Sequence, residues 1–134
     1  MGTLGMNLLL DTCAFIWLCS APGQFSPNAR KVLQNQADME LFVSDASVLE
    51  IALKSSLGKL TLPSEPRSWI EEQASIWGIE LLPITHEIIY FSADLPKHHK
   101  DPFDRLIIAT ALTCNFSIIT SDQFFESYGC KVVW

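Results

Sequence analysis

Short apolar runs are spaced along the chain, and longer stretches of mixed polar and apolar residues separate them. The runs are continuous rather than alternating, which is typical of strands that are buried on both faces of a parallel sheet. We expect five such strands, at residues 6–11, 40–45, 79–85, 116–122 and 130–134.

The longer stretches have boundary residues that favour helices. Ser26 is suited to the N-cap and Pro27 to the first position of one helix, and Gly58 and Gly78 are suited to the ends of two others. Helices are expected at residues 12–19, 27–36, 46–58, 65–78, 86–95 and 102–115, with a short helix or turn at 123–129. Strands that alternate with helices predict an α/β fold with a doubly wound, mainly parallel five-stranded sheet.

The composition is typical of one cytoplasmic domain. A chain of 134 residues, 49% of them apolar, can form a single core, so residues 1–134 are interpreted as one domain, with 1–5 as a disordered extension if Met6 is the natural start. No apolar run reaches the roughly 18 residues of a membrane span, and the N-terminal stretch lacks the basic segment of a secretory signal. The four cysteines form no C-x-x-C pair, so we expect buried, reduced thiols.

The net charge of −6 bears directly on function. General nucleic-acid binders are basic, because contacts with phosphate release counterions, so the acidity argues against a nucleic-acid ligand. Two features oppose that argument. Bound metal ions reverse the local charge, and residues 97–100 (Lys-His-His-Lys) form the one concentrated basic patch.

Four acidic residues are expected at one edge of the sheet. Asp11 and Asp122 end the first and fourth predicted strands, and Glu50 and Asp104 lie in the first turns of two predicted helices. Helices that follow parallel strands begin at the carboxyl edge of the sheet, where ligands bind in open α/β folds. Asp104 joins this edge if its helix runs parallel to the others.

Each acid also has a structural explanation. Asp101 is suited to the N-cap of the helix at 102–115, and Asp104 would complete an arrangement like a capping box. Asp11 and Asp122 could cap the segments that follow them, and Glu50 has the spacing of a capping box as well.

Taken together, the acids favour a metal site. Apolar neighbours indicate that the helices carrying Glu50 and Asp104 are mostly buried, and crowded carboxylates in a low dielectric cannot all ionise without a cation. Mg²⁺ and Mn²⁺ prefer oxygen ligands, lower the pKa of a bound water and neutralise charge on a phosphodiester. The four acids therefore predict metal-dependent phosphodiester hydrolysis without a serine or histidine nucleophile.

Four segments carry a family resemblance: LLLDTCAFIWL, VSDASVLEIALKSSLGKL, HHKDPFDRLIIATAL and IITSDQFFESYG. In order and spacing they are similar to PIN-domain proteins, and more closely to the VapC-type toxins of bacterial type II toxin–antitoxin pairs. The resemblance extends over residues 7–134. It implies a three-layer α/β/α fold, an endoribonuclease that depends on Mg²⁺ or Mn²⁺, a homodimer, and a cognate antitoxin that inserts into the active-site groove.

The resemblance also implies roles for particular residues. Asp11, Glu50, Asp104 and Asp122 would be the metal ligands and the catalytic residues, with Asp11 and Asp104 as the principal ligands. Asp101 is interpreted as a helix cap, with a metal role as the alternative.

Six further residues are expected near the substrate. They are Thr12, Lys54, His99, Arg105, Thr120 and Ser121. The three hydroxyls could hold metal-bound water, and the two long cations could meet an RNA phosphate or pair with a nearby acid. His99 belongs to the basic patch, which would contact the RNA backbone or remain a solvated loop, and we do not expect it to be a metal ligand.

Two other classes of protein stay open. A catalytically silent PIN-like module would act only through protein contacts, and the loss of an acid would favour it. A metal-dependent phosphatase of another α/β family, such as a haloacid dehalogenase, needs a second aspartate where this chain has Cys13. The helices between residues 45 and 77 are more apolar than a small sheet requires, so part of them is expected to face a partner subunit or the antitoxin.

Overall fold

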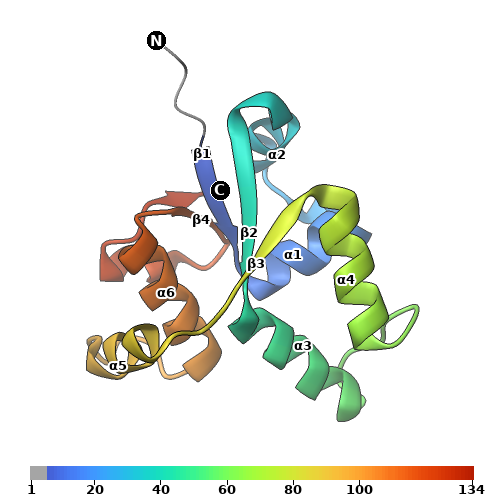
Figure 1. Ribbon diagram of the computed structural model, residues 1–134. Coiled ribbons are helices and arrows are strands. Elements are labelled where there is room, and N and C mark those ends of the chain that lie inside the picture. Colours follow the sequence, from blue (N-terminus) through green and yellow to red (C-terminus); the bar gives the residue numbers. More distant parts are fainter. Residues whose placement is uncertain (1–5) are drawn as a thin grey trace.

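Five parallel strands form the centre of the molecule, seen here in a computed structural model that describes residues 6–134 (Figure 1). The strand order is β3–β2–β1–β4–β5, so the order reverses between β1 and β4. The strands are β1 (Met6–Leu10), β2 (Met39–Ser44), β3 (Ile79–Leu82), β4 (Ser117–Ile119) and β5 (Val132–Val133). The predicted α/β fold is confirmed, and the extension predicted at residues 1–5 lies outside the described residues.

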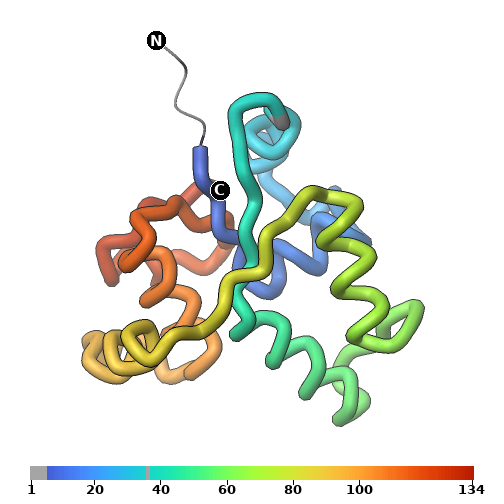
Figure 2. Tube along the Cα trace, in the orientation of Figure 1, coloured from blue at the N-terminus to red at the C-terminus, as the bar shows by residue number. Residues whose placement is uncertain are grey.

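Helices cover both faces of this sheet. The helices are α1 (Thr12–Ser20), α2 (Pro27–Gln34), α3 (Asp45–Ser56), α4 (Pro66–Trp77), α5 (His86–Asp94) and α6 (Pro102–Cys114), with short 3₁₀ helices η1 (Pro22–Gln24), η2 (Gln36–Asp38) and η3 (Gln123–Tyr128). Residues of α1 to α4 pack on one face, and residues of α5, α6 and η3 pack on the other. After β3 the chain crosses to this second face (Figure 2). Among residues 6–134, no helix is both long and apolar enough to span a membrane.

The continuous apolar run of β1 is explained by burial on both faces. Leu8 and Leu10 pack beneath α1 to α4, whereas Leu9 packs beneath α5 and α6, and all three are fully buried. Each buried leucine contributes about 1.5–3 kcal/mol relative to an exposed one. The central strand therefore fixes the position of whatever follows it at the carboxyl edge.

The predicted helix boundaries are largely confirmed. The Ser26 hydroxyl accepts a hydrogen bond from the Ala29 N–H, and α2 begins at Pro27. Gly78 has the left-handed conformation that ends α4, and Asn115 has the same conformation after α6. Such helix ends require a positive φ, which glycine adopts without strain, and this explains Gly78.

Three predicted strands are clearly shorter in the structure, among them β3, which has four residues rather than the seven predicted at 79–85. β4 has three residues rather than the seven predicted at 116–122, and β5 has two rather than the five predicted at 130–134. The chain leaves β4 at Thr120, whose hydroxyl accepts the Asp122 N–H and donates to Asp11. Asp122 therefore caps η3 instead of ending a strand, and Asp11 caps α1 directly after β1.

The prediction for the cysteines is confirmed in part. All four are free thiols, but only Cys130 is buried, while Cys19 is half-buried. Cys13 and Cys114 are exposed, so the expected burial is wrong for them. Cys13 is the second residue of α1, and Cys114 is the last residue of α6, where the helix leaves the core.

Candidate metal centre

The site lies at the carboxyl edge of the sheet, where β1 and β4 run side by side. Asp11 follows β1, and its N–H donates to the Ile119 carbonyl at the end of β4, 3.2 Å away. Its carboxylate accepts one hydrogen bond from the Ala14 N–H at 2.8 Å and another from the Thr120 hydroxyl at 2.5 Å. Both bonds fix the orientation of an almost fully buried carboxylate.

Burial dominates the electrostatics of Asp11. Loss of solvent raises the pKa of its carboxyl to about 6, although the bonds from Thr120 and Ala14 oppose that rise. The negative charges of Asp122 and Glu50 raise the pKa further. Asp11 thus stands in a group of acids that repel one another.

Glu50 reaches the same edge from α3, which begins after the N-cap Ser44. The Glu50 side chain is buried, and its Oε2 accepts a hydrogen bond from Lys54 Nζ at 2.5 Å, one turn along the helix. Glu50 Oε1 is the single buried side-chain oxygen or nitrogen without a hydrogen-bond partner in the part of the chain that the structure describes. A buried carboxylate oxygen without a donor is costly, so this atom marks a place for a cation.

The capping alternative for Glu50 is not the arrangement found. Ser44 caps α3 by accepting the Ala46 N–H, and the buried Ser47 hydroxyl instead accepts a hydrogen bond from Thr12 Oγ1 at 2.9 Å. The Thr12 hydroxyl therefore joins the start of α1 to α3, beside the acids.

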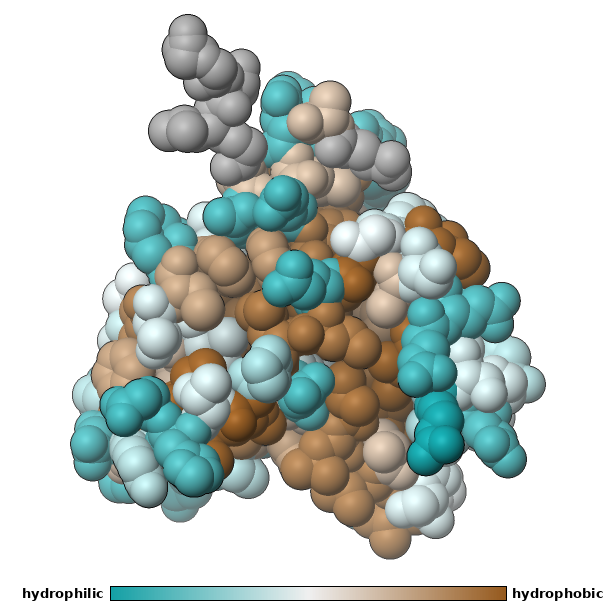
Figure 3. Space-filling model, in the orientation of Figure 1, coloured by the Kyte–Doolittle hydropathy of each residue, from teal (hydrophilic) through white to brown (hydrophobic). Residues whose placement is uncertain are grey.

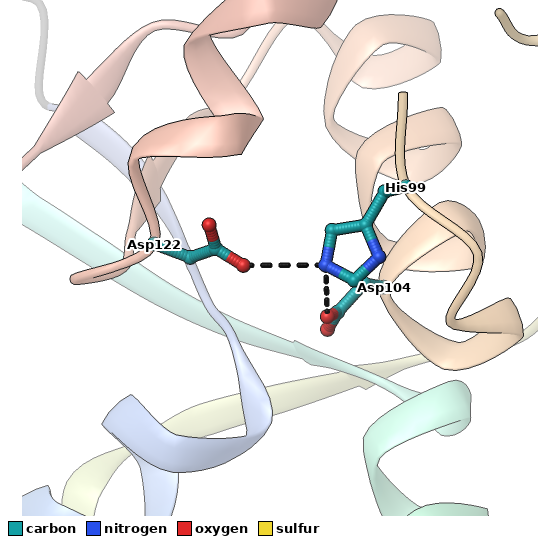
Figure 4. Close-up of side chains that lie close together, drawn as sticks. All are labelled: His99, Asp104 and Asp122. Carbon is teal, nitrogen blue, oxygen red and sulfur yellow. Dashed lines mark hydrogen bonds and ion pairs between the residues drawn. The ribbon is translucent and has the colours of Figure 1, made fainter. Parts of the chain in front are cut away.

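Asp104 and Asp122 meet through a histidine (Figure 4). His99 Nε2 lies 3.0 Å from Asp104 Oδ2 and 3.3 Å from Asp122 Oδ2. The three side chains offer ligand atoms that all lie within 4.8 Å of one another. The second oxygen of Asp122 accepts the Phe124 N–H at 2.9 Å, which caps η3.

Asp101 caps α6, as predicted. Its Oδ1 accepts the N–H groups of Phe103 at 2.8 Å and Asp104 at 3.4 Å. The predicted capping box is wrong, however, because the Asp101 N–H donates to His99 Nδ1 at 3.1 Å and not to the Asp104 carboxylate. This leaves the Asp104 side chain free to face the other acids.

The pKa of Asp104 depends on residues from all parts of the site. Burial raises the pKa of its carboxyl to about 7, with a further rise from the charge of Asp101 and an opposing effect of His99. The charges of Asp11 and Glu50 raise it as well. The four predicted acids therefore lie near enough to influence one another, at one edge of the sheet.

Arg105 faces away from the acids. Its guanidinium is buried and donates to the carbonyls of Ser92 and Leu95, at 2.7 and 2.8 Å, and to those of Pro96 and His99, at 2.8 and 3.2 Å. These bonds hold the loop between α5 and α6 against α6. The placement favours a positioning role over the predicted phosphate contact.

Tyr128 completes the support of this loop. Its hydroxyl accepts the His99 N–H at 2.7 Å and donates to the Pro96 carbonyl at 2.9 Å. Sequence reasoning missed this contribution. It also missed the bond from the Asp101 N–H to His99 Nδ1, for which a signal was available: His99 lies two residues before the N-cap Asp101, where a side-chain acceptor can meet the N–H of the cap residue.

The chemistry of the donor set fits a hard divalent cation. Asp11 and Asp104 have raised pKa values, and Glu50 has a buried oxygen without a partner, so the site concentrates negative charge that Lys54 balances only in part. Carboxylate oxygens are the ligands that Mg²⁺ and Mn²⁺ prefer. Asp11, Glu50, Asp104 and Asp122 are the residues that could hold such an ion.

This protein is a parallel α/β domain with an acidic site where the strand order reverses. The PIN domain profile matches residues 8–129, and the chain belongs to the PIN domain family. Ribonuclease VapC22 of Mycobacterium tuberculosis is 29% identical to it over 123 residues, which cover 91% of this chain and 92% of that protein.

Solved structures share the fold at low sequence identity. The VapBC2 structure from Rickettsia felis, bound to a DNA fragment from its promoter, contains a chain that matches with a TM-score of 0.70 and 12% identity, over 95% of this chain and 97% of that one. A chain of VapBC-1 from nontypeable Haemophilus influenzae matches with a TM-score of 0.59 and 18% identity, over 95% and 96% of the two chains. The three-layer arrangement is thus that of the PIN fold.

Proposed function

We propose that this protein is a metal-dependent endoribonuclease and the toxin of a toxin–antitoxin pair. The observation that carries the proposal is the group of four acids at the point where the strand order reverses, in which Asp11 and Asp104 have raised pKa values and Glu50 Oε1 has no partner. The 29% identity to a ribonuclease VapC over nearly the full length supports the same activity.

Asp11 and Asp104 are the principal ligands of Mg²⁺ or Mn²⁺ in this proposal, and Glu50 and Asp122 complete the set. When bound, the ion would activate a water and neutralise charge on the phosphodiester. The chain's own residues keep the ligands in place: Thr120 orients Asp11, and Lys54 orients Glu50. Fixed ligands reduce the reorganisation that binding and catalysis require.

The RNA would approach from the exposed rim of this edge. Lys54, which is half exposed, lies one helical turn from Glu50, and Ser121, which is exposed, directly precedes Asp122; both could contact phosphate. The basic patch at residues 97–100, which includes His99, could meet the RNA backbone. Local positive charge from the patch and from metal ions would offset the net charge of −6.

An antitoxin and a second subunit are the proposed protein partners. Leu49 and Leu53 of α3 and its C-cap residue Leu57 form an exposed stripe. The surface at the bottom of Figure 3, where α3 lies in Figure 1, is apolar. Glu50 follows Leu49 directly, about 100° around the helix axis, so a protein bound along the stripe would lie beside the acids. Ile89, Tyr90 and Phe91 on α5 form a second exposed apolar group that a partner subunit could cover.

The test compares the wild type with Asp104→Asn and with the control Asp94→Asn, which alters an exposed acid on α5. Binding of Mn²⁺ and Mg²⁺ is measured by calorimetry, and cleavage is measured on end-labelled single-stranded RNA. We expect metal binding and cleavage in the wild type and the control. Asp104→Asn should lose metal binding and about 1000-fold in cleavage rate, because it removes a ligand worth several kcal/mol. Intact RNA with all three proteins would overturn the proposal and leave a protein-interaction module, whereas equal cleavage by all three would overturn the role of Asp104 in the metal site.

A further inference from the structure

We propose that His99 is a positioning residue whose Nε2–H holds Asp104 and Asp122 together for a cation, without itself binding the metal. The inference rests on the proposed metal site and concerns how the chain builds it. His99 is the one basic group placed between two of the four acids in the described part of the chain (Figure 4).

The hydrogen bonds of the ring determine which nitrogen carries the proton. His99 Nδ1 lies 3.1 Å from the backbone nitrogen of Asp101, whose N–H can only donate. Nδ1 must therefore be the acceptor, and a ring with one proton carries it on Nε2. The two atoms near Nε2 are carboxylate oxygens of Asp104 and Asp122, which accept such a proton.

This tautomer excludes the ring from the metal. A histidine ligand binds through the lone pair of an unprotonated nitrogen, and it donates from its other nitrogen. For Nε2 of His99 to bind a cation, the proton would have to move to Nδ1, where it would face the Asp101 N–H. The backbone of the α6 cap thus fixes Nε2 as a donor.

The surroundings of His99 hold the ring in this position. Its backbone N–H donates to the Tyr128 hydroxyl, and its carbonyl accepts from Arg105. The rings of Phe124 and Phe125 lie nearly perpendicular to it, with centroids 6.3 and 6.4 Å away. A donor with so little freedom can keep two mutually repelling carboxylates at a fixed separation.

The other two acids, Asp11 and Glu50, also accept a hydrogen bond from a side-chain donor. Thr120 donates to one oxygen of Asp11, and Lys54 donates to one oxygen of Glu50. His99 is the corresponding donor for the remaining two acids. Donors that orient metal ligands in this way contribute 10–100-fold to metal affinity in other proteins, by order of magnitude.

Two substitutions test the contacts of the two ring nitrogens separately. In His99→Gln the side-chain amide can place an N–H near the position of Nε2, whereas in His99→Asn the shorter side chain ends near Nδ1 and can only replace the contact with Asp101. His98→Asn, at the neighbouring exposed histidine, is the matched control. Circular dichroism and thermal unfolding establish that each variant is folded.

Calorimetry gives the first measurement. We expect His99→Asn to bind Mn²⁺ and Mg²⁺ about 10–100-fold more weakly, by a similar factor for both ions, while His99→Gln and His98→Asn retain most of the wild-type affinity. A histidine ligand would instead favour the softer ion, so its loss would weaken Mn²⁺ more than Mg²⁺. Wild-type affinity in His99→Asn, or a loss confined to Mn²⁺, would overturn the inference.

Nitrogen NMR of the ring gives a second measurement that is independent of catalysis. In protein labelled with ¹⁵N at histidine, Nε2 of His99 should carry its proton both without metal and with saturating Mg²⁺. Loss of that proton on Mg²⁺ binding would identify a ligand and overturn the positioning role. If the wild type bound neither ion, the proposed function would fail as well. If the wild type bound both ions and His99→Asn bound them equally well, only the positioning role of His99 would fail.

Discussion

The two sides of the acidic site are built in different ways. On the strand side, Asp11 and Glu50 are only 8% and 6% exposed and follow directly from a central strand and a buried helix. On the loop side, the side chains of Asp104 and Asp122 are 21% and 30% exposed, and they meet through His99. The packed core positions the first pair, whereas side-chain bonds to the backbone position the second.

The two sides therefore lose stability for different reasons when the metal site is formed. The strand side loses stability through the burial of negative charge, because desolvation raises the pKa of Asp11. The loop side must order the segment between α5 and α6, and Arg105 and Tyr128 supply hydrogen bonds that offset this loss of entropy. Substitutions on the two sides should therefore affect different measurements.

The largest effect is expected for Arg105→Met on the loop side. The change keeps an apolar stem of similar length but leaves four backbone carbonyls without their buried donor. We expect a loss of about 3 kcal/mol in the free energy of unfolding, measured by urea denaturation. Arg30→Met is the control, because the exposed Arg30 donates to the Phe25 carbonyl. Equal losses in the two variants would show that the loop does not depend on Arg105.

On the strand side, Asp11 makes the free energy of unfolding of the metal-free protein depend on pH. The pKa of Asp11 rises from 3.8 to about 6 on folding, so between these values the folded protein binds more protons than the unfolded chain. The free energy of unfolding therefore falls as pH rises through this range. A shift of this size corresponds to about 3 kcal/mol for Asp11, and the raised pKa of Asp104 acts in the same direction up to about pH 7.

Asp11→Asn isolates this contribution. The amide has no charge to desolvate, so the variant should lose the Asp11 part of the slope and exceed the wild type in stability at pH 8. Urea denaturation in the presence of a chelator, repeated from pH 4 to pH 8, measures both curves. Parallel curves for the two proteins would mean that burial of the Asp11 charge does not destabilise the fold.

The strand side was open to prediction from sequence because its placement follows from topology. A residue that follows a central parallel strand must lie at the carboxyl edge, so Asp11 could be located without knowledge of its contacts. The loop side was less accessible. The partners of Arg105 are backbone carbonyls, which leave no pattern in the sequence, and the role of His99 depends on the direction of one backbone N–H. The end of β4 was misplaced because a hydroxyl contact of Thr120 turns the chain after Ile119.

The smallest effects are expected when one hydroxyl is removed from each side. Ser47→Ala removes the acceptor of Thr12 on the strand side, and Tyr128→Phe removes the acceptor of the His99 N–H on the loop side. Ser47→Ala breaks one hydrogen bond between uncharged groups and should cost about 1 kcal/mol in urea denaturation. Tyr128→Phe also removes the donor to the Pro96 carbonyl and should cost about 2 kcal/mol. Calorimetry with Mn²⁺ should then distinguish them. The core holds Glu50 in Ser47→Ala, so its affinity should stay at the wild-type value, whereas Tyr128→Phe frees the loop that carries His99 and should bind Mn²⁺ more weakly. Tyr90→Phe, at an exposed tyrosine of α5, controls for the loss of a phenol. Equal affinities in Ser47→Ala and Tyr128→Phe would show that both sides are positioned by the core.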